Sequence, residues 1–227
     1  MYSLIHQQVD AIVLVPIDSK ALVQPVVEAV RKGVPVINID IRLDTQLLEQ
    51  AGVEVAFVGP DNFAAAYEVG KLLDKKLRNE DKVAIIEGLT AADNAQQRKR
   101  GFIKAIEEKG LRLVASEPAD WETEKAAEVF QAMWMRYPDL KAVYCSNDAM
   151  ALGVLQQMQE KNCYLPVVGF DNDAVMKEFL STGKLVATAD IFSSQMAVRG
   201  IEFALDVLEG KIENRGVHST AYEIIKQ

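Results

Sequence analysis

The feature that most constrains the fold of this chain is a regular alternation between short apolar runs and longer amphipathic segments. Eight runs rich in Val, Ile and Ala resemble strands that are buried on both faces of a parallel sheet. They lie at 10–16, 34–40, 53–59, 82–88, 111–117, 141–146, 165–170 and 184–191. Because most are separated by segments with helical spacing, we predict βαβ units and a doubly wound α/β fold with right-handed crossovers.

Two of the helical segments carry an apolar stripe of the kind that packs against a sheet. In 61–77 the stripe is formed by Phe63, Ala66, Tyr67, Gly70 and Leu73. In 194–209 it is formed by Met196, Ile201, Ala204, Leu205 and Leu208. No low-complexity linker divides the chain, and eight strands are many for one modest sheet. Two α/β lobes joined by several short crossings fit this pattern.

The chain is acidic, with 33 Asp and Glu against 25 Lys and Arg, and its formal charge is −8. This balance argues against a surface for nucleic acid or anionic membranes as its main function. No apolar run approaches the roughly 20 residues that span a bilayer. Residues 1–10 lack the charged leader and apolar core of a signal peptide. Cys145 and Cys163 predict neither a disulfide framework nor a metal site.

Polar and aromatic side chains gather after the predicted strands, which is where open α/β sheets bind ligands. They are Asp40, Arg42, Asp93, Asn94, Arg98, Arg100, Trp121, Asn147, Asp148, Phe170, Asp171 and Asp190. Carboxylates accept hydrogen bonds from hydroxyl groups, Arg and Asn donate to hydroxyl oxygens, and an aromatic ring covers the C–H face of a sugar. The set therefore suits a neutral ligand with many hydroxyl groups.

The stretch YCSNDAMALGV, residues 144–154, shows the main alternative for such residues. An Asp or Asn between a strand and a helix is by default an N-cap, which accepts hydrogen bonds from the first helical turn. We assign the cap to Asp148 and a ligand contact to Asn147.

Catalytic motifs are missing from the sequence. It has no G-x-S-x-G, G-x-x-x-x-G-K-[ST], G-x-G-x-x-G or H-E-x-x-H motif, and no His stands at a strand end as a general base. A carboxylate pair for glycoside hydrolysis stays open, because Asp residues are plentiful and their separation is not visible in the sequence. We expect a binding protein with no catalytic residues, no metal and no cofactor, and not an enzyme.

The motifs DAIVLVPIDSKAL, GVPVINID, QRKRGF, PADW, SNDAMALGVL, VVGFDN and GKLVATA occur in this order along the chain. Together they resemble the periplasmic sugar-binding proteins of the ribose-binding type, whose fold the effector domains of LacI-type repressors share. The resemblance covers essentially the whole chain. It implies the fold of type I periplasmic binding proteins, in which two parallel-sheet lobes joined by three hinge crossings close around a sugar. Lobe one would comprise 1–60 and 192–219, and lobe two 61–191 and 220–227.

The resemblance also implies roles for seven residues. Asp40 and Asp171 would accept from sugar hydroxyls, Arg98 would donate to sugar oxygens, and Trp121 would stack on the ring. The remaining polar contacts would come from Arg42, Asn94 and Asn147.

Three departures from the family pattern bear on the ligand. Ile41 stands between Asp40 and Arg42, where the family has Asp-Arg. Val15 and Ile191 stand where the ribose binder has an asparagine and a glutamine. Since both changes remove polar contacts, they argue against ribose itself as the ligand.

The first strand and most of the first helix of the family are absent. In that lobe the missing strand is central, so we expect its two neighbours to face each other across a gap. Two explanations fit: the chain is a fragment or has a misassigned start within a longer secreted protein, or it is an internally initiated isoform. We favour the first, with a signal peptide upstream. Such a protein is periplasmic, or lipid-anchored outside a Gram-positive cell.

The first functional hypothesis is a solute-binding protein that delivers a monosaccharide or polyol to the membrane subunits of an ABC importer, or to a chemoreceptor. It would be monomeric at full length and would not bind nucleic acid. The alternative is the effector domain of a LacI-type regulator without its DNA-binding domain. An enzyme on a related scaffold ranks third.

Overall fold

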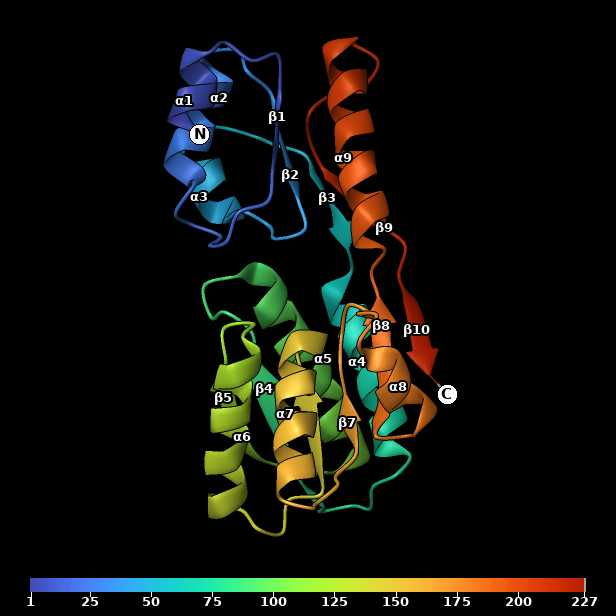
Figure 1. The fold of residues 1–227 in the computed structure, drawn as a ribbon. Helices are drawn as coiled ribbons and strands as arrows, with labels where there is room; N and C mark the ends of the chain where they lie inside the picture. Colours follow the sequence, from blue (N-terminus) through green and yellow to red (C-terminus); the bar gives the residue numbers. More distant parts are fainter. Residues whose placement is uncertain (227) are drawn as a thin grey trace. The chain divides into compact units, whose positions relative to one another are not determined.

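The computed structural model describes residues 1–226 and shows an α/β chain that forms two compact units (Figure 1). Unit 1 comprises Met1–Asp61, Ala91–Asn94 and Phe192–Ala221. Unit 2 comprises Asn62–Thr90, Ala95–Ile191 and the residues from Tyr222 on. The lobes predicted from the sequence have the same boundary at Phe192, end one residue before Asp61 and two residues before Ala221, and do not include the segment Ala91–Asn94 in lobe one. Gln227, at the end of predicted lobe two, lies outside the described residues.

Unit 1 contains a four-stranded parallel sheet in the order β1-β2-β3-β9. Its strands are β1 (Ile12–Leu14), β2 (Val36–Ile39), β3 (Phe57–Pro60) and β9 (Val217–Thr220). Its helices are α1 (Tyr2–His6), α2 (Val23–Arg31), α3 (Thr45–Gln50) and α9 (Ser193–Leu208). Alternate residues of β2 serve two cores, because Val36 packs with α2 and α3 while Ile37 and Ile39 pack with Ala204 of α9.

The sheet of unit 1 is continuous and ends at β1, and no described strand pairs with the outer edge of β1. The expectation of a gap between two separated neighbours was therefore wrong. The strands β1, β2, β3 and β9 are neighbours in this order, and they pair without interruption.

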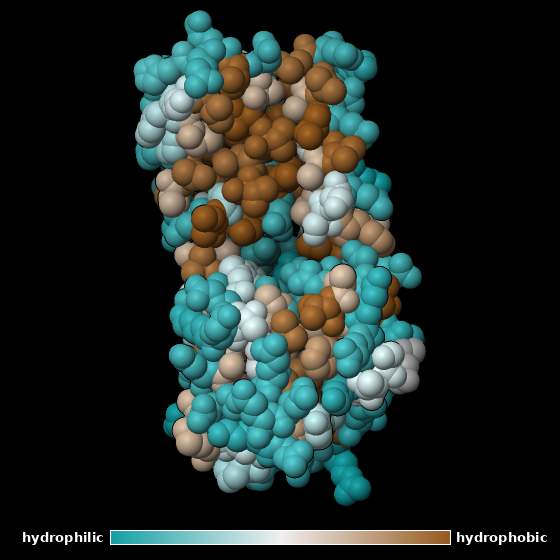
Figure 2. Space-filling view, in the orientation of Figure 1, coloured by the Kyte–Doolittle hydropathy of each residue, from teal (hydrophilic) through white to brown (hydrophobic). Residues whose placement is uncertain are grey.

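The predicted apolar stripe of α9 is only partly buried. Met196 and Ala204 are covered, and Gly200 approaches β1 and β2 so closely that a Cβ there would lie 2.7 Å from Ile39 Cγ2. Ile201, Leu205 and Leu208 are 54, 53 and 46% exposed, in contrast to the prediction. Figure 2 shows an apolar surface over unit 1. About half of the surface of each of these three side chains is therefore not covered by the described residues.

Unit 2 contains a six-stranded sheet in the order β10-β8-β7-β6-β4-β5, parallel except for β10. Its strands are β4 (Lys82–Glu87), β5 (Arg112–Pro118), β6 (Ala142–Cys145), β7 (Val167–Val168), β8 (Leu185–Asp190) and β10 (Glu223–Lys226). Its helices are α4 (Asn62–Asp74), α5 (Asp93–Lys109), α6 (Thr123–Arg136), α7 (Asp148–Glu160) and α8 (Met176–Ser181). The first two residues of α5 belong to unit 1.

Each of the eight predicted runs contains or overlaps a strand, and the doubly wound α/β class is confirmed. The strands β9 and β10 have no counterpart among the apolar runs. β9 is largely exposed and β10 lies at a sheet edge, so neither needs a continuous apolar sequence. Among the described residues, no helix combines the length and the apolar character needed to cross a bilayer.

Replacing Ile201 and Leu205 together by Glu should lower the binding of a hydrophobic dye and the light scattering of the chain. The reason is that contiguous exposed apolar side chains promote association. Dye fluorescence and static light scattering measure the effect. Met135→Glu is the control, because Met135 is 70% exposed but lies in unit 2. An equal change in both variants would contradict the prediction.

Candidate functional site

The candidate site is the part of unit 2 around Arg98, where the carboxyl ends of several strands meet. Arg98 lies in α5 and is 2% exposed. Its Nε donates to Asn62 Oδ1 at 2.9 Å, and its Nη1 donates to Ser146 O at 2.8 Å. Nη1 also lies 3.4 Å from Asp171 Oδ1. Since α4, the residue after β6 and the segment after β7 each supply one partner, the guanidinium position depends on three separate parts of unit 2.

The Arg98 guanidinium has one donor group left for a ligand. Nη2 donates to no side chain or carbonyl in residues 1–226, and it is not one of the fully buried atoms without a partner. An arginine that is fixed through Nε and Nη1 presents its remaining N–H groups in a defined direction. Such a donor suits the oxygen atoms of a neutral ligand.

Two aromatic rings accompany the guanidinium. The Arg98 Cζ lies 3.7 Å from the centroid of Phe170 and 5.5 Å from that of Trp121. Phe170 is fully buried, whereas Trp121 is only partly buried. Both distances are within the range of attraction between a cation and a ring. The partly exposed Trp121 ring can therefore also offer area to a ligand.

The position of Trp121 depends on Gly88, which sequence reasoning missed. Asp120 and Trp121 have φ angles of 52° and 71°, in the left-handed region. The indole ring lies over Gly88, directly after β4, where a Cβ would be 2.0 Å from Trp121 Cη2. A glycine at the end of an apolar run is the sequence signal that indicates such a close approach.

Gly88→Ala should displace the Trp121 ring and lower the free energy of unfolding by about 1–3 kcal/mol, because the methyl group overlaps the indole. Tryptophan emission and urea unfolding measure the change. In a Trp121→Ala background the same substitution should have almost no effect, since the overlapping ring is gone. An equally large effect in that background would contradict the explanation.

The N-cap of α7 is Asn147, whereas the sequence had predicted Asp148. Asn147 is the N-cap of α7, and its Oδ1 accepts from Met150 N at 2.9 Å. Asp148 is fully buried, and its carboxylate accepts from Asp173 N and Thr188 Oγ1. The assignment of the cap to Asp148 was wrong because the extended backbone of Asn147 aims its own side chain at the first turn. Asn147 Nδ2 donates to no described residue, so a ligand contact through this group stays a prediction.

Burial raises the pKa of Asp148 from 3.8 to about 7, because an apolar environment disfavours the ionised carboxylate. The negative charges of Asp171 and Asp173 act in the same direction. The hydrogen bonds from Asp173 N and Thr188 Oγ1 favour the ionised form and lower the pKa. Desolvation outweighs them, so Asp148 changes its charge near neutral pH.

The free energy of unfolding should fall as the pH rises from about 4 to about 7. Across this window the folded chain keeps a proton on Asp148 that the unfolded chain has lost, and the slope is at most about 1.4 kcal/mol per pH unit. Asp148→Asn should remove this contribution. Tryptophan fluorescence during urea unfolding reports on unit 2, which holds both Trp121 and Trp134. An unchanged pH slope in the variant would contradict the prediction.

Two of the residues predicted in unit 1, Asp40 and Arg42, follow the end of β2. Asp40 has a φ of 64°. Asn38 supports this turn, because its Nδ2 donates to Ile41 O and its Oδ1 accepts from Leu43 N, both at 2.8 Å. Ile41, which stands between Asp40 and Arg42, is buried. The chain thus turns after β2 through the left-handed Asp40, and the apolar side chain of Ile41 points inward.

Arg42 and Asn94 have separate surroundings. The Arg42 guanidinium lies 5.7 Å from the ring centroid of Phe57 and lines a cavity of about 180 Å³ with residues of α3. Asn94 is buried, and its Oδ1 has no hydrogen-bond partner among the described residues. The structure brings together Arg98, Trp121 and Asp171 within unit 2. Ligand contacts by all seven residues remain predictions.

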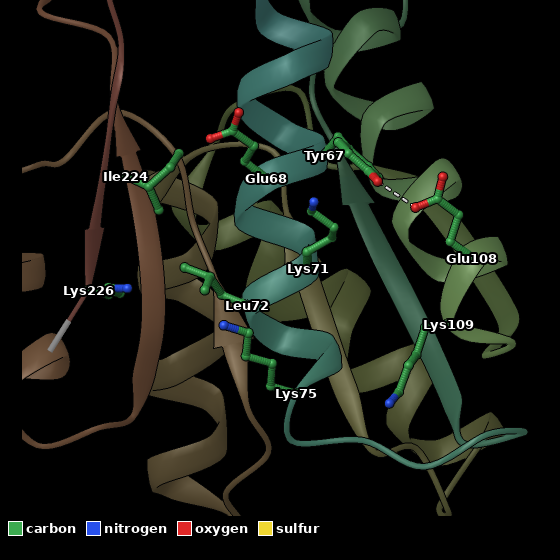
Figure 3. A pocket seen from close by; sticks show the side chains of 9 residues that line it. All are labelled: Tyr67, Glu68, Lys71, Leu72, Lys75, Glu108, Lys109, Ile224 and Lys226. Carbon is green, nitrogen blue, oxygen red and sulfur yellow. Dashed lines mark hydrogen bonds between the residues drawn. The ribbon is translucent and has the colours of Figure 1, made fainter.

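A groove of about 680 Å³ lies elsewhere in unit 2, between α4, the end of α5 and β10 (Figure 3). Its lining includes Lys71, Lys75, Lys109 and Lys226. None of the predicted site residues lines it. Lys109 is eleven residues beyond Arg98 in α5, which corresponds to about 16 Å along a helix. The groove is therefore distinct from the site around Arg98.

The described residues contain no group of three His, Cys, Asp or Glu side chains suited to a metal ion. The donors and acceptors around Arg98 are instead an arginine, amides, a carboxylate and aromatic rings. Such a set binds neutral hydroxyl groups by hydrogen bonds and by contact with C–H faces.

Comparison with known proteins identifies the family. The model of the periplasmic binding protein domain matches residues 1–212. This chain belongs to the periplasmic binding protein family. The D-ribose/D-allose-binding protein of Pseudomonas aeruginosa is 43% identical over 222 residues, which are 96% of this chain and 70% of that protein. The result confirms the ribose-binding type predicted from the motifs.

Two solved structures have the same fold as this periplasmic binding protein. An ABC transporter solute-binding protein from Burkholderia multivorans has a TM-score of 0.94 at 41% identity, covering 99% of this chain and 80% of that one. A solute-binding protein from Actinobacillus succinogenes with bound D-allose has a TM-score of 0.92 at 31% identity, covering 99% and 81%.

Proposed function

We propose that this chain is the sugar-binding component of an ABC importer and binds a monosaccharide or a related polyol. The observation that carries the proposal is Arg98, a buried cation fixed on two sides with Nη2 left to donate. The names of the relatives, a D-ribose/D-allose-binding protein and a D-allose-bound solute-binding protein, support the same class of ligand.

In unit 2 we assign the ligand contacts as follows. Arg98 Nη2 donates to sugar oxygens, Asp171 accepts from a hydroxyl group, and Trp121 covers a C–H face of the ring. Asn147 donates through Nδ2. These groups discriminate by hydrogen bonding, because an analogue without the matching hydroxyl would leave a buried polar group unpaired.

In unit 1 we propose Asp40, Arg42 and Asn94 as further contacts. The side chains of Val15 and Ile191 offer no hydrogen bond, which fits a sugar other than ribose. D-Allose is the first candidate, because two relatives carry it in their names or as ligand.

We further propose that the protein acts in the periplasm after secretion, as a monomer, and delivers its ligand to the membrane subunits of the importer or to a chemoreceptor. A binding role without catalysis agrees with the relatives, which are named as binding proteins. We place a LacI-type effector domain second, because the relatives are named as binding proteins.

Isothermal titration of the chain with D-allose, D-ribose and myo-inositol tests the proposal. Arg98→Gln or Asp171→Ala should weaken the binding of the preferred ligand at least about tenfold, because each removes a charge-assisted hydrogen bond worth about 1.5–3 kcal/mol. Circular dichroism checks that the variants are folded.

Lys71→Ala is the matched control, because it removes a positive charge from unit 2 in the separate groove. It should leave the affinity unchanged. Unchanged affinity in Arg98→Gln and Asp171→Ala would remove both residues from the site, and no heat with any monosaccharide or polyol would refute the proposed ligand class.

A further inference from the structure

The carboxylate of Asp148 connects three parts of unit 2. Its Oδ2 accepts from Asp173 N at 2.9 Å, and its Oδ1 accepts from Thr188 Oγ1 of β8 at 2.9 Å. The backbone N of Asp148 donates to Phe170 O at 2.7 Å. Asp148 is fully buried at the start of α7. Asp148 is therefore hydrogen-bonded to the chain both before and after Asp171, to Phe170 through its backbone and to Asp173 through its side chain.

Thr188 extends this contact to the next amide group. Its Oγ1 accepts from Asn172 N at 3.2 Å and donates to Asp148 Oδ1. The backbone N–H groups of Asn172 and Asp173 are thus both linked to the Asp148 carboxylate. Asn172 is linked through the Thr188 hydroxyl group, and Asp173 is linked directly. Asp171 N donates to Ala189 O at 2.7 Å. Three successive amide groups of this loop are hydrogen-bonded to α7 or β8.

The loop requires such support because its backbone is unfavourable for L-residues. Asp171 has a φ of 108° and Asn172 a φ of 59°. Space for the carboxylate comes from Gly169, where a Cβ would lie 2.0 Å from Asp148 Oδ1. The strained segment is the one that brings Asp171 to 3.4 Å from Arg98.

The ionisable groups near Asp148 come from the loop after β7 and from β6. Asp171 and Asp173 of the loop and Cys145 of β6 interact with it electrostatically. The contact from β8 is the neutral Thr188. No described Lys, Arg or His forms an ion pair with Asp148. Its ionised form is therefore held by hydrogen bonds alone.

We propose that Asp148 is a positioning residue for sugar binding: its ionised carboxylate holds residues 170–173 in the shape that presents Asp171 to the ligand. The inference rests on the proposed function for its effect on affinity. Its effect on the loop does not depend on any ligand. A protonated Asp148 can accept only one of the two hydrogen bonds well, because its second oxygen then carries a proton.

The first test measures affinity for D-allose from pH 6 to pH 8 by titration calorimetry, since the sugar itself does not ionise in this range. A strict requirement for ionised Asp148, with a pKa of about 7, weakens wild-type binding about tenfold between pH 8 and pH 6. Asp148→Asn should bind weakly at both pH values. Equal, pH-independent affinity in the wild type and the variant would overturn the proposal.

Thr188 supplies a matched pair of variants that leave the carboxylate in place. Thr188→Val removes the hydroxyl link to Asn172 N and should weaken binding, whereas Thr188→Ser keeps the link and should bind almost as the wild type does. This pair of variants tests the positioning role if Asp148→Asn fails to fold. Equal affinity of the Val and Ser variants would contradict the role of the link.

Amide hydrogen exchange separates this inference from the proposed function. In the chain without sugar, Asp148→Asn and Thr188→Val should speed exchange at Asn172 or Asp173 at least about tenfold, while exchange in β4 stays unchanged. If the wild type binds no sugar but these amides respond, only the proposed ligand fails. If the chain binds sugar but the amides do not respond, only the positioning role fails.

Discussion

The structure of unit 2 depends on the burial of the Arg98 guanidinium. An arginine removed from water is costly unless hydrogen bonds and opposite charge replace its hydration. Here the replacements are Asn62 Oδ1, Ser146 O and Asp171, together with the face of Phe170. They come from three segments at the carboxyl edge of the sheet: the start of α4, the residue after β6 and the segment after β7. The charge can therefore be buried only if those segments are all in place, and Nη2 is left without a hydrogen-bond partner among the described residues.

A second buried ionisable group, Asp148, lies on the other side of the same loop. The two groups do not form an ion pair, and each acts on the segment that carries Asp171. Arg98 attracts the Asp171 carboxylate, while Asp148 holds the backbone that follows it. Buried charges of this kind rarely improve stability, and burial raises the pKa of Asp148 to about 7 because it disfavours the ionised carboxylate. Such local conflicts are typical of functional sites.

In unit 1, hydrophobic periodicity alone did not predict which side chains of α9 are buried. The stripe of α9 has the spacing of a buried face, and Met196 and Ala204 are indeed buried. Ile201, Leu205 and Leu208 belong to the same stripe but are about half exposed. A helical pattern predicts which side chains share a face. Which of them are covered depends on what packs against that face in the tertiary structure.

The sequence by itself determined the alternation of strands and helices, the parallel sheets and the family, because buried parallel strands need continuous apolar runs and the motifs occur in a specific order. It also placed Arg98, Trp121 and Asp171 at strand ends. Only the tertiary structure decided which of the neighbours Asn147 and Asp148 caps α7. Both side chains can cap a helix, and the outcome was set by the backbone of Asn147 together with the space that Gly169 leaves for the carboxylate. The importance of Asn62 and Gly88 likewise became visible only in the fold, since their partners, Arg98 and Trp121, lie more than 30 residues away in the chain.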